Sequence, residues 1–184
     1  MASIVDICNS SLLRIGDDPI LSLDDDSVRA RTVKDLYPKV RDAVLRAHPW
    51  NCALARTSLA LLEAAPSWGF NCQYTLPTNP YCLRVLKTNS TKDWKVEGRN
   101  LLTDEGSIRI LYIKRIEDPT ELDALLSECI ITRLSAELAV LTGKTSMAEI
   151  QWKLYINKLS EARSIDAIEG TPEEFENKEF LDVR

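Results

Sequence analysis

Residues 107–141 read SIRILYIKRIEDPTELDALLSECIITRLSAELAVL, and the pattern that decides the fold changes within this stretch. Residues 107–114 are rich in β-branched and aromatic side chains, which is typical of a strand. Asp118 and Pro119 then supply residues that commonly begin a helix. Apolar residues follow at helical spacing from Leu122 to Leu141. The sequence therefore predicts a strand that leads directly into a long helix.

The β pattern extends back from this stretch to residue 67. Gly98 separates two short runs in the manner of a hairpin, and Pro77 begins a turn. The runs that read as strands, besides 107–114, lie at residues 68–76, 81–87, 94–97 and 101–103. They predict a sheet of four or five short antiparallel strands. We expect residues 67–116 to form a small inserted β-sheet domain.

Helical patterns lie on both sides of that insert. Ser3 is expected to cap a first helix that ends near Ile15, and Pro38 is expected to kink or break a second helix near Leu36. The segments with helical spacing cover residues 3–15, 24–47, 122–141 and 146–168. Each of these helices has one apolar face and needs a partner, so the two ends of the chain should pack together.

The sequence thus predicts an α+β fold that is mostly α, a helical bundle with a small antiparallel β insert. Residues 1–66 and 117–169 would form the helical bundle, 67–116 the inserted domain, and 170–184 an extended C-terminal tail. The chain has 184 residues, which is the size of one domain or of one domain with a small insert.

Composition and charge exclude several classes of protein. Hydrophobic residues make up 45% and charged residues 28%, which are ordinary globular values. No run approaches the roughly 18 apolar residues that a membrane span needs, and the N-terminus has no basic leader. We therefore expect a protein that is made and folded in a cytoplasm. Lys and Arg number 23 against 28 Asp and Glu, whereas proteins that grip duplex DNA usually have a basic excess.

The motifs that resemble chemical sites are better explained by structure. Gly143, Lys144 and Thr145 match the end of a phosphate-binding loop, but Leu138 occupies the position of its first glycine, which favours a turn between helices. The five cysteines, at 8, 52, 72, 82 and 129, have neither zinc-ligand nor disulfide spacing, so we expect reduced, buried thiols.

The remaining candidates for catalysis or metal binding are equally weak. Asp24, Asp25 and Asp26 are expected to favour a helix start rather than to hold a cation. His48 is the only histidine, and a catalytic pair with Cys52 is less expected than a structural role at a helix end. The four tryptophans are expected in the core or at subunit contacts. We expect no enzyme activity, no cofactor and no metal.

An ordered set of motifs is similar to the tail tubular protein A family of short-tailed phages. The motifs cover roughly residues 4–170, and the tail beyond Gly170 lies outside them. They are LLRIG (12–16), PI (19–20), SLDDDS (22–27), VRDAVLRAHPWN (40–51), YTLP (74–77), CLRV (82–85), WKVEGR (94–99), AELA (136–139) and LSEAR (159–163).

This resemblance implies a structural role in the virion. Members of the family are head-to-tail adaptors that form a ring, commonly of twelve copies, between the portal protein and the tail nozzle protein. The genome DNA passes through the centre of the ring. The chain would be found in the neck of the virion, and in the host cytoplasm during assembly. A net charge of −5 gives a ring of twelve about −60, which would discourage DNA from adhering.

The C-terminal tail suggests a docking hypothesis. Phe175, Phe180 and Leu181 lie among acidic residues on a segment too short to bury them, so we expect them to dock onto the portal protein by ordering on binding. The alternative is a frayed end with no partner.

Two other functions remain open at this stage. The first is a phage-borne hydrolase that acts on cell-envelope polysaccharide, which needs two carboxylates about 5 to 9.5 Å apart across a cleft. The second is a DNA-contacting protein. A continuous basic stripe would favour it, and the candidate residues are Arg29, Arg31, Lys34, Arg41 and Arg46.

Overall fold

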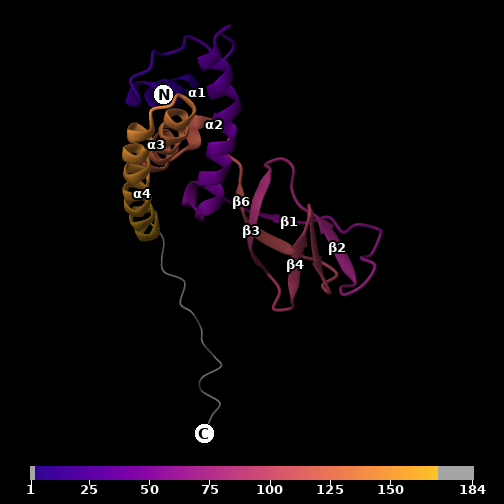
Figure 1. Cartoon of the computed structure of the whole chain (residues 1–184). Coiled ribbons are helices and arrows are strands. Elements are labelled where there is room, and N and C mark those ends of the chain that lie inside the picture. Colours follow the sequence, from indigo (N-terminus) through magenta and orange to yellow (C-terminus); the bar gives the residue numbers. More distant parts are fainter. Residues whose placement is uncertain (1–2, 170–184) are drawn as a thin grey trace.

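A computed structural model of the chain describes residues 3–169, which form a helical lobe and a β-lobe (Figure 1). The helical lobe contains α1 (Ile4–Arg14), α2 (Val28–Ala47), α3 (Ala124–Leu141) and α4 (Thr145–Ile168). The β-lobe contains β1 (Leu54–Ser58), β2 (Cys72–Thr75), β3 (Cys82–Thr88), β4 (Trp94–Glu97), β5 (Asn100–Thr103) and β6 (Arg109–Lys114). No helix in this part of the chain is long and apolar enough to cross a membrane.

The first helix begins as its sequence predicts. The Ser3 hydroxyl accepts a hydrogen bond from the Asp6 backbone N–H at 3.1 Å, and the Asp6 carboxylate accepts one from the Ser3 N–H at 2.9 Å. This reciprocal cap satisfies two backbone donors that a helix start would otherwise leave unpaired. Gly16, with φ of 66°, follows the last turn and lets the chain reverse. The predicted cap at Ser3 is confirmed.

The second helix runs through Pro38 without a break. Val28–Ala47 is one continuous helix, so the break expected near Leu36 is absent. A proline inside a helix costs about 3 kcal/mol. Val33, Tyr37, Val40 and Val44 are all buried on the same helix, and burial of such side chains contributes about 1.5–3 kcal/mol each. Burial of this apolar face therefore outweighs the lost backbone hydrogen bond.

Two antiparallel sheets form the β-lobe. One has the strand order β1-β6-β3 and the other has the order β2-β5-β4. The expected hairpin is present, because β4 and β5 pair from Trp94 opposite Thr103 to Glu97 opposite Asn100. β1 pairs along its whole length with β6, from Leu54 opposite Ile113 to Ser58 opposite Arg109. The first strand after α2 in the chain, β1, is therefore an edge strand of this sheet.

Each lobe has its own hydrophobic core. The helical core includes Leu45, Trp50, Ile130 and Leu134, and Ile113 from β6 is buried in the same cluster. A second core lies between the two sheets and contains Tyr74, Leu76, Cys82, Leu101, Ile108, Ile110 and Tyr112. β6 therefore contributes to both cores, and it ties the β-lobe to the helices.

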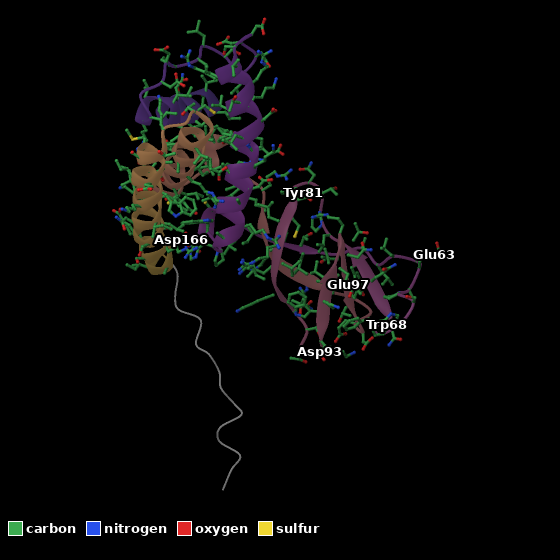
Figure 2. All side chains as sticks on the ribbon, viewed as in Figure 1. Glu63, Trp68, Tyr81, Asp93, Glu97 and Asp166 are labelled. Carbon is green, nitrogen blue, oxygen red and sulfur yellow. The ribbon has the colours of Figure 1, made fainter. Side chains whose placement is uncertain are left out.

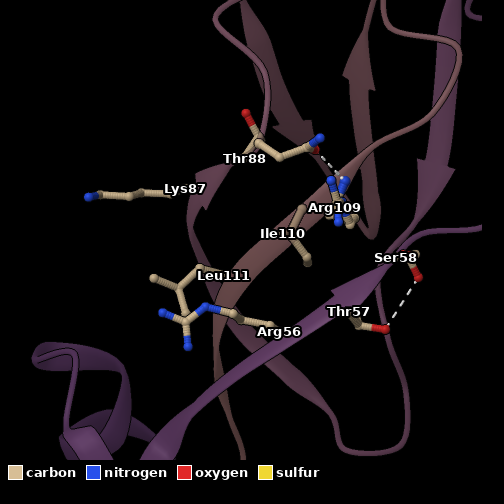
Figure 3. A pocket seen from close by; sticks show the side chains of 9 residues that line it. Arg56, Thr57, Ser58, Lys87, Thr88, Arg109, Ile110 and Leu111 are labelled. Atoms are coloured by element: carbon tan, nitrogen blue, oxygen red, sulfur yellow. Dashed lines mark hydrogen bonds between the residues drawn. The ribbon is translucent and has the colours of Figure 1, made fainter.

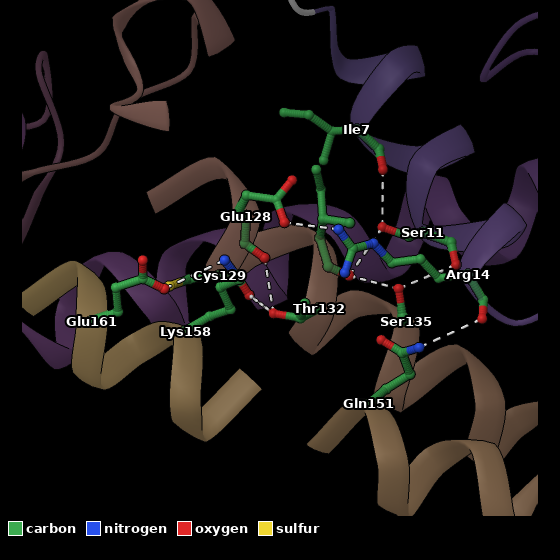
Figure 4. Close-up of polar contacts among 11 residues, drawn as sticks. Ile7, Ser11, Arg14, Glu128, Cys129, Thr132, Ser135, Gln151, Lys158 and Glu161 are labelled. Carbon is green, nitrogen blue, oxygen red and sulfur yellow. Dashed lines mark hydrogen bonds and ion pairs between the residues drawn. The ribbon is translucent and has the colours of Figure 1, made fainter. Parts of the chain in front are cut away.

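Serines allow α1 and α3 to approach closely (Figure 4). Ser11 and Ser135 are fully buried. The Ser135 hydroxyl donates to the Ile131 carbonyl at 2.7 Å or to the Ser11 carbonyl at 3.2 Å, and the Ser11 hydroxyl lies 2.9 Å from the Ile7 carbonyl. At the edge of this contact Arg14 pairs with Glu128 at 2.7 Å. The two helices thus satisfy their buried hydroxyls with backbone carbonyls across the contact.

The prediction of a mostly α helical bundle with a small β insert is wrong. Among residues 3–169, 47% are helical and 20% are in strands, arranged as four α-helices and two three-stranded sheets, which is a mixed α+β fold. The four or five strands expected in one sheet are six strands in two. Leu54–Ser58, which the sequence pattern places in the helical bundle (1–66), is strand β1. This short run has no clear alternation, and only its partner β6 makes it a strand.

Candidate protein-interaction surfaces

Charge is divided unevenly between the parts of the chain. Residues 54–116, which contain the six strands, carry nine Lys and Arg against five Asp and Glu, a formal net charge of +4. The helical segments 1–53 and 117–169 together carry twelve basic and eighteen acidic residues, a net charge of −6. Residues 170–184 carry two basic and five acidic residues, a net charge of −3. The β-lobe is therefore the basic part of an acidic protein.

Four arginines line one hollow of the β-lobe, which we call the arginine hollow. Arg46 reaches it from the last turn of α2, Arg84 from β3, Arg99 from the β4–β5 turn and Arg115 from the end of β6. The hollow has a volume of about 470 Å³, and no carboxylate is among its lining residues. Its apolar lining is Leu76, Leu83, Val85, Trp94 and Val96. It is therefore an electropositive hollow with apolar walls, at the junction of the two lobes.

Tyr81 organises two of these arginines. The guanidinium carbons of Arg99 and Arg115 lie over the Tyr81 ring, at 4.1 and 4.2 Å from its centroid. Arg99 also donates to the carbonyls of Cys82 at 2.8 Å and Pro77 at 2.6 Å. Figure 2 labels Tyr81 on the side of the β-lobe that faces the helices. Cation–π contacts thus hold both guanidiniums, and backbone acceptors also hold that of Arg99, although the two charges repel each other.

Little negative charge balances the arginine hollow. Of its four arginines, only Arg115 forms an ion pair within residues 3–169, with the Asp42 carboxylate at 2.5 Å. The Arg115 Nε is buried without a hydrogen-bond partner in that range. Arg84 donates to the Arg46 carbonyl at 3.2 Å, and Arg46 donates to the Leu83 carbonyl. Carbonyl partners orient guanidiniums but do not neutralise them, so the hollow favours an anionic ligand.

A second basic surface lies on the outer face of the sheet β1-β6-β3 (Figure 3). Arg56 and Lys87 both lie opposite Leu111 of β6, and Arg109 lies opposite Ser58. The hollow between them has a volume of about 530 Å³. Neither Arg56 nor Arg109 forms an ion pair with a described residue. Ile110 and Leu111 are its apolar lining, and Arg56 and Arg109 are exposed.

An apolar surface covers part of the helical lobe. Val140, Trp152 and Ile156 are 64%, 45% and 48% exposed. Trp152 and Ile156 are four residues apart, so they lie on one stripe of α4. The hollow between α3 and α4 has a volume of about 340 Å³, and Ala136, Val140, Ala148 and Trp152 provide its apolar lining. Adjacent exposed apolar side chains of this kind indicate a protein contact. We call it the α3–α4 surface.

The phosphate-loop fragment is a turn, as predicted. Gly143, with φ of 73°, lies between the end of α3 and the start of α4. The Lys144 ammonium donates to the Ile15 carbonyl at 2.8 Å and to the Gly16 carbonyl at 3.3 Å. A helix rather than a strand precedes the glycine, and the lysine is engaged in holding the end of α1.

The three aspartates at residues 24–26 form part of a turn before α2. Ser27 is the cap of that helix, and its hydroxyl accepts from the Ala30 N–H at 3.1 Å. Asp25 accepts from the N–H groups of Leu21 and Ser22, and Asp24 pairs with Lys34 at 2.6 Å. No cluster of three or more metal-ligating side chains occurs within the described range.

The single histidine contacts an aspartate rather than a thiol. His48 is the last capping residue of α2, and its Nε2 lies 3.1 Å from the Asp166 carboxylate on α4. Burial raises the pKa of the Cys52 thiol, so this group is a poor nucleophile at neutral pH. All five cysteines are free; Cys8, Cys82 and Cys129 are buried, and Cys52 and Cys72 are half-buried.

Four of the five basic residues of α2 that were considered for DNA contact are paired individually, and the five form no continuous stripe. Arg29 pairs with Asp17 and Asp18, Arg31 with Asp26, and Lys34 with Asp24. Arg41 is buried against Asp42, and Arg46 alone turns into the arginine hollow. The residues considered for DNA contact are therefore largely neutralised where they stand.

Three carboxylates do line one hollow, but two of them, Asp118 and Glu121, are already engaged. Glu117, Asp118 and Glu121 border a hollow of about 470 Å³ beside Lys114. Glu121 pairs with Lys114 at 2.7 Å. Hydrogen bonds from the Thr120 backbone and hydroxyl lower the pKa of Asp118. A glycosidase general acid needs a raised pKa, so this group has the opposite property.

The remaining predicted site residues, Phe175, Phe180 and Leu181, lie outside the described residues. No protein-family model matches the chain, and no curated protein matches it either. The arginine hollow was missed at the sequence level because its arginines are far apart in the chain. The only signal that pointed to it was the positive net charge of residues 54–116.

Proposed function

We propose that this chain is the subunit of a head-to-tail adaptor ring in a short-tailed phage, between the portal protein and the tail nozzle protein. It would be a structural protein of the virion, and DNA would pass through the ring without tight binding. The observation that carries the proposal is the presence of two unlike surfaces in one small chain. The β-lobe is basic and the α3–α4 surface is apolar, on a lobe of net negative charge.

Unlike surfaces suit a ring because a ring repeats one head-to-tail contact. Each subunit must present two different, complementary patches rather than one patch that meets itself. Trp152 and Ile156 supply the apolar part of such a contact. The resemblance of the ordered motifs to the tail tubular protein A family supports the same reading.

The acidic helical lobe agrees with a channel that does not hold DNA. Proteins that grip the duplex neutralise phosphates with unpaired Lys and Arg. Here Arg29, Arg31 and Lys34 on α2 are each paired with an aspartate. A channel wall built from the helical lobe would repel the phosphate backbone.

The portal contact is assigned to the C-terminal segment. Phe175, Phe180 and Leu181 lie among five carboxylates in residues 173–182. A short acidic segment with aromatic residues is a common form of peptide that orders on a partner. Deletion of residues 171–184 should weaken binding to the portal protein, and undiminished binding would contradict this assignment.

Mass measurement tests the adaptor function directly. The purified full chain is analysed by native mass spectrometry and light scattering, first alone and then mixed with the portal protein encoded by the same genome. We expect the chain alone to be a monomer and the mixture to contain one ring of adaptor subunits on each portal ring. Electron microscopy of the mixture should show the added ring.

The control uses a portal protein from an unrelated phage, which should not recruit the chain. A chain that stays monomeric with its own portal protein, and that is absent from purified virions, would overturn the proposal.

A further inference from the structure

We propose that the arginine hollow is the binding site for the chain's own acidic C-terminal segment, residues 173–182. This inference does not require the adaptor function. It concerns the free chain, and it assigns to Arg46, Arg84, Arg99 and Arg115 a ligand of defined chemistry: an acidic peptide with aromatic residues.

The composition of the segment matches the lining of the hollow. Residues 173–182 read EEFENKEFLD, with five carboxylates, one lysine, two phenylalanines and one leucine. The hollow offers four guanidiniums and no lining carboxylate, and its accessible apolar walls include Trp94, Val85 and Val96. Carboxylates pair with guanidiniums in a forked geometry, and a phenylalanine between them would contact the indole and aliphatic groups. Both parts of the ligand therefore have a counterpart in the site.

Three of the guanidiniums have no anionic partner among residues 3–169. Within residues 3–169, Arg46, Arg84 and Arg99 hydrogen-bond only to backbone carbonyls. The two guanidiniums over the Tyr81 ring bring like charges together in a partly buried place. A bound carboxylate would relieve that repulsion, and it would reach donors that are already oriented.

The end of α4, where the described residues stop, lies near Arg46 of the hollow. Asp166, in the last turn of α4, accepts from the Asn51 backbone N–H at 2.9 Å, and its carbonyl accepts from the Asn51 side chain at 2.6 Å. Arg163 of α4 donates to the Ala47 carbonyl at 3.5 Å, and Ala47 directly follows Arg46. Figure 2 labels Asp166 at this end of α4. Residues 170–184 span at most about 50 Å when extended, so the hollow is within their reach.

The hollow suits an acidic peptide better than DNA. A phosphate backbone would use the arginines but would leave the accessible parts of Trp94, Val85 and Val96 facing solvent. The second basic surface, around Arg56 and Arg109, has no aromatic residue in its lining, whereas the arginine hollow has Tyr81 and Trp94. It therefore serves as the matched control for a purely electrostatic attraction.

Peptide binding to the full chain tests the proposal. The probe is a fluorescent synthetic peptide of residues 170–184, and binding is followed by fluorescence anisotropy at low salt. The host is the full chain with its own tail weakened by Phe175→Ala, Phe180→Ala and Glu174→Lys. We expect this host to bind the peptide about tenfold more tightly than the wild-type chain, in which the native tail competes from a high local concentration.

Charge reversal then locates the site. In the same host, Arg46→Glu with Arg84→Glu should weaken binding of the peptide by about tenfold or more, because two attractive contacts become repulsive. Arg56→Glu with Arg109→Glu makes the same change in net charge, and it should alter binding by less than about twofold. A peptide with Glu173→Lys, Glu174→Lys and Glu176→Lys should bind the Arg46→Glu, Arg84→Glu host better than the native peptide does. Circular dichroism confirms that each host is folded.

Each alternative result has a definite meaning. No saturable binding to the weakened host, or equal loss in both pairs of arginine variants, would overturn the proposal. A short duplex DNA that binds at Arg46 and Arg84 where the peptide does not would also overturn it, in favour of a nucleic-acid site. None of these measurements uses the portal protein, so failure here is distinguishable from failure of the adaptor function.

Discussion

His48 joins the end of α2 to the end of α4. Its ring is 3.1 Å from Asp166 and makes an edge contact with Trp50 at a centroid distance of 4.7 Å. Burial lowers the pKa of His48, and the charges of Arg163 and Arg84 act in the same direction. The Asp166 hydrogen bond and charge act in the opposite direction but do not dominate. The folded chain therefore favours the neutral imidazole.

The pKa of this single histidine is predicted to lie below 6.5, and NMR titration of its ring protons measures it directly. Asp166→Asn should lower the pKa further, because it removes the group that stabilises the imidazolium ion. Asp93→Asn, at the far end of the β-lobe in Figure 2, should leave it unchanged. A pKa above 6.5, or a rise in Asp166→Asn, would contradict this account.

The same shift has a consequence for stability. Because the folded pKa is below the unfolded value, the contribution of His48 is fully present above about pH 6.5 and is lost as pH falls toward the folded pKa. Urea unfolding of the wild type and of His48→Asn should therefore differ in their pH dependence across this window. Identical pH profiles would show that the histidine is not coupled to folding.

At the scale of elements, the contact between α1 and α3 depends on small side chains. Ser11 and Ser135 are fully buried, and Ser135 donates toward carbonyls on both helices. A serine leaves room for a neighbouring backbone, and it brings a donor that a buried carbonyl can use. The close approach of the two helices therefore requires a small residue at position 135.

Ser135→Leu is predicted to lower the free energy of unfolding by about 1–3 kcal/mol, because the larger side chain overpacks the contact. Ser135→Ala should cost about 1 kcal/mol or less, because it loses only a hydrogen bond. Urea denaturation at neutral pH measures both variants. Ser160→Leu, on an exposed position of α4, is the control and should lie within about 0.5 kcal/mol of the wild type. Equal effects at positions 135 and 160 would contradict the packing argument.

At the scale of the whole molecule, the two lobes present different chemistry to a partner. The β-lobe carries a net charge of +4 and the helical segments carry −6, while the α3–α4 surface exposes Trp152 and Ile156. The basic β-lobe attracts carboxylates, and the α3–α4 surface favours contact with apolar side chains. This division allows a subunit to meet neighbours of different kinds without the same surface serving both contacts.

Assembly is predicted to fail when the α3–α4 surface becomes charged. Trp152→Glu with Ile156→Glu should leave a folded monomer that forms no ring on the portal protein. The contact between subunits would then have to bury two unpaired carboxylates in place of apolar side chains, which costs free energy. Native mass spectrometry and electron microscopy of the portal mixture provide the readout. Leu21→Glu with Leu61→Glu alters two exposed apolar residues elsewhere, and it should leave ring formation intact. Normal rings in the first variant would show that the contact lies on another surface.

Local sequence was sufficient for most of the helices and for the hairpin. Ser3 as a cap, the turn at Gly143 and the pairing of residues 94–97 with 100–103 are all decided by residues close in the chain. Capping groups, turn glycines and apolar spacing act over a few residues, so they can be recognised in order. Strand β1 could not be recognised in this way, because its pairing with β6 joins residues more than fifty positions apart.

The sequence by itself determined that four helical segments lie on either side of the strands, that the chain is acidic, and that it contains no recognisable catalytic motif. Tertiary structure alone decided that six strands form two sheets, that Arg29, Arg31 and Lys34 are paired with aspartates, and that four distant arginines share one hollow. The physical reason is the distance along the chain over which the two kinds of interaction act. Backbone geometry and capping are local, whereas the charge and shape of a surface depend on which distant side chains the packing of the two cores brings together.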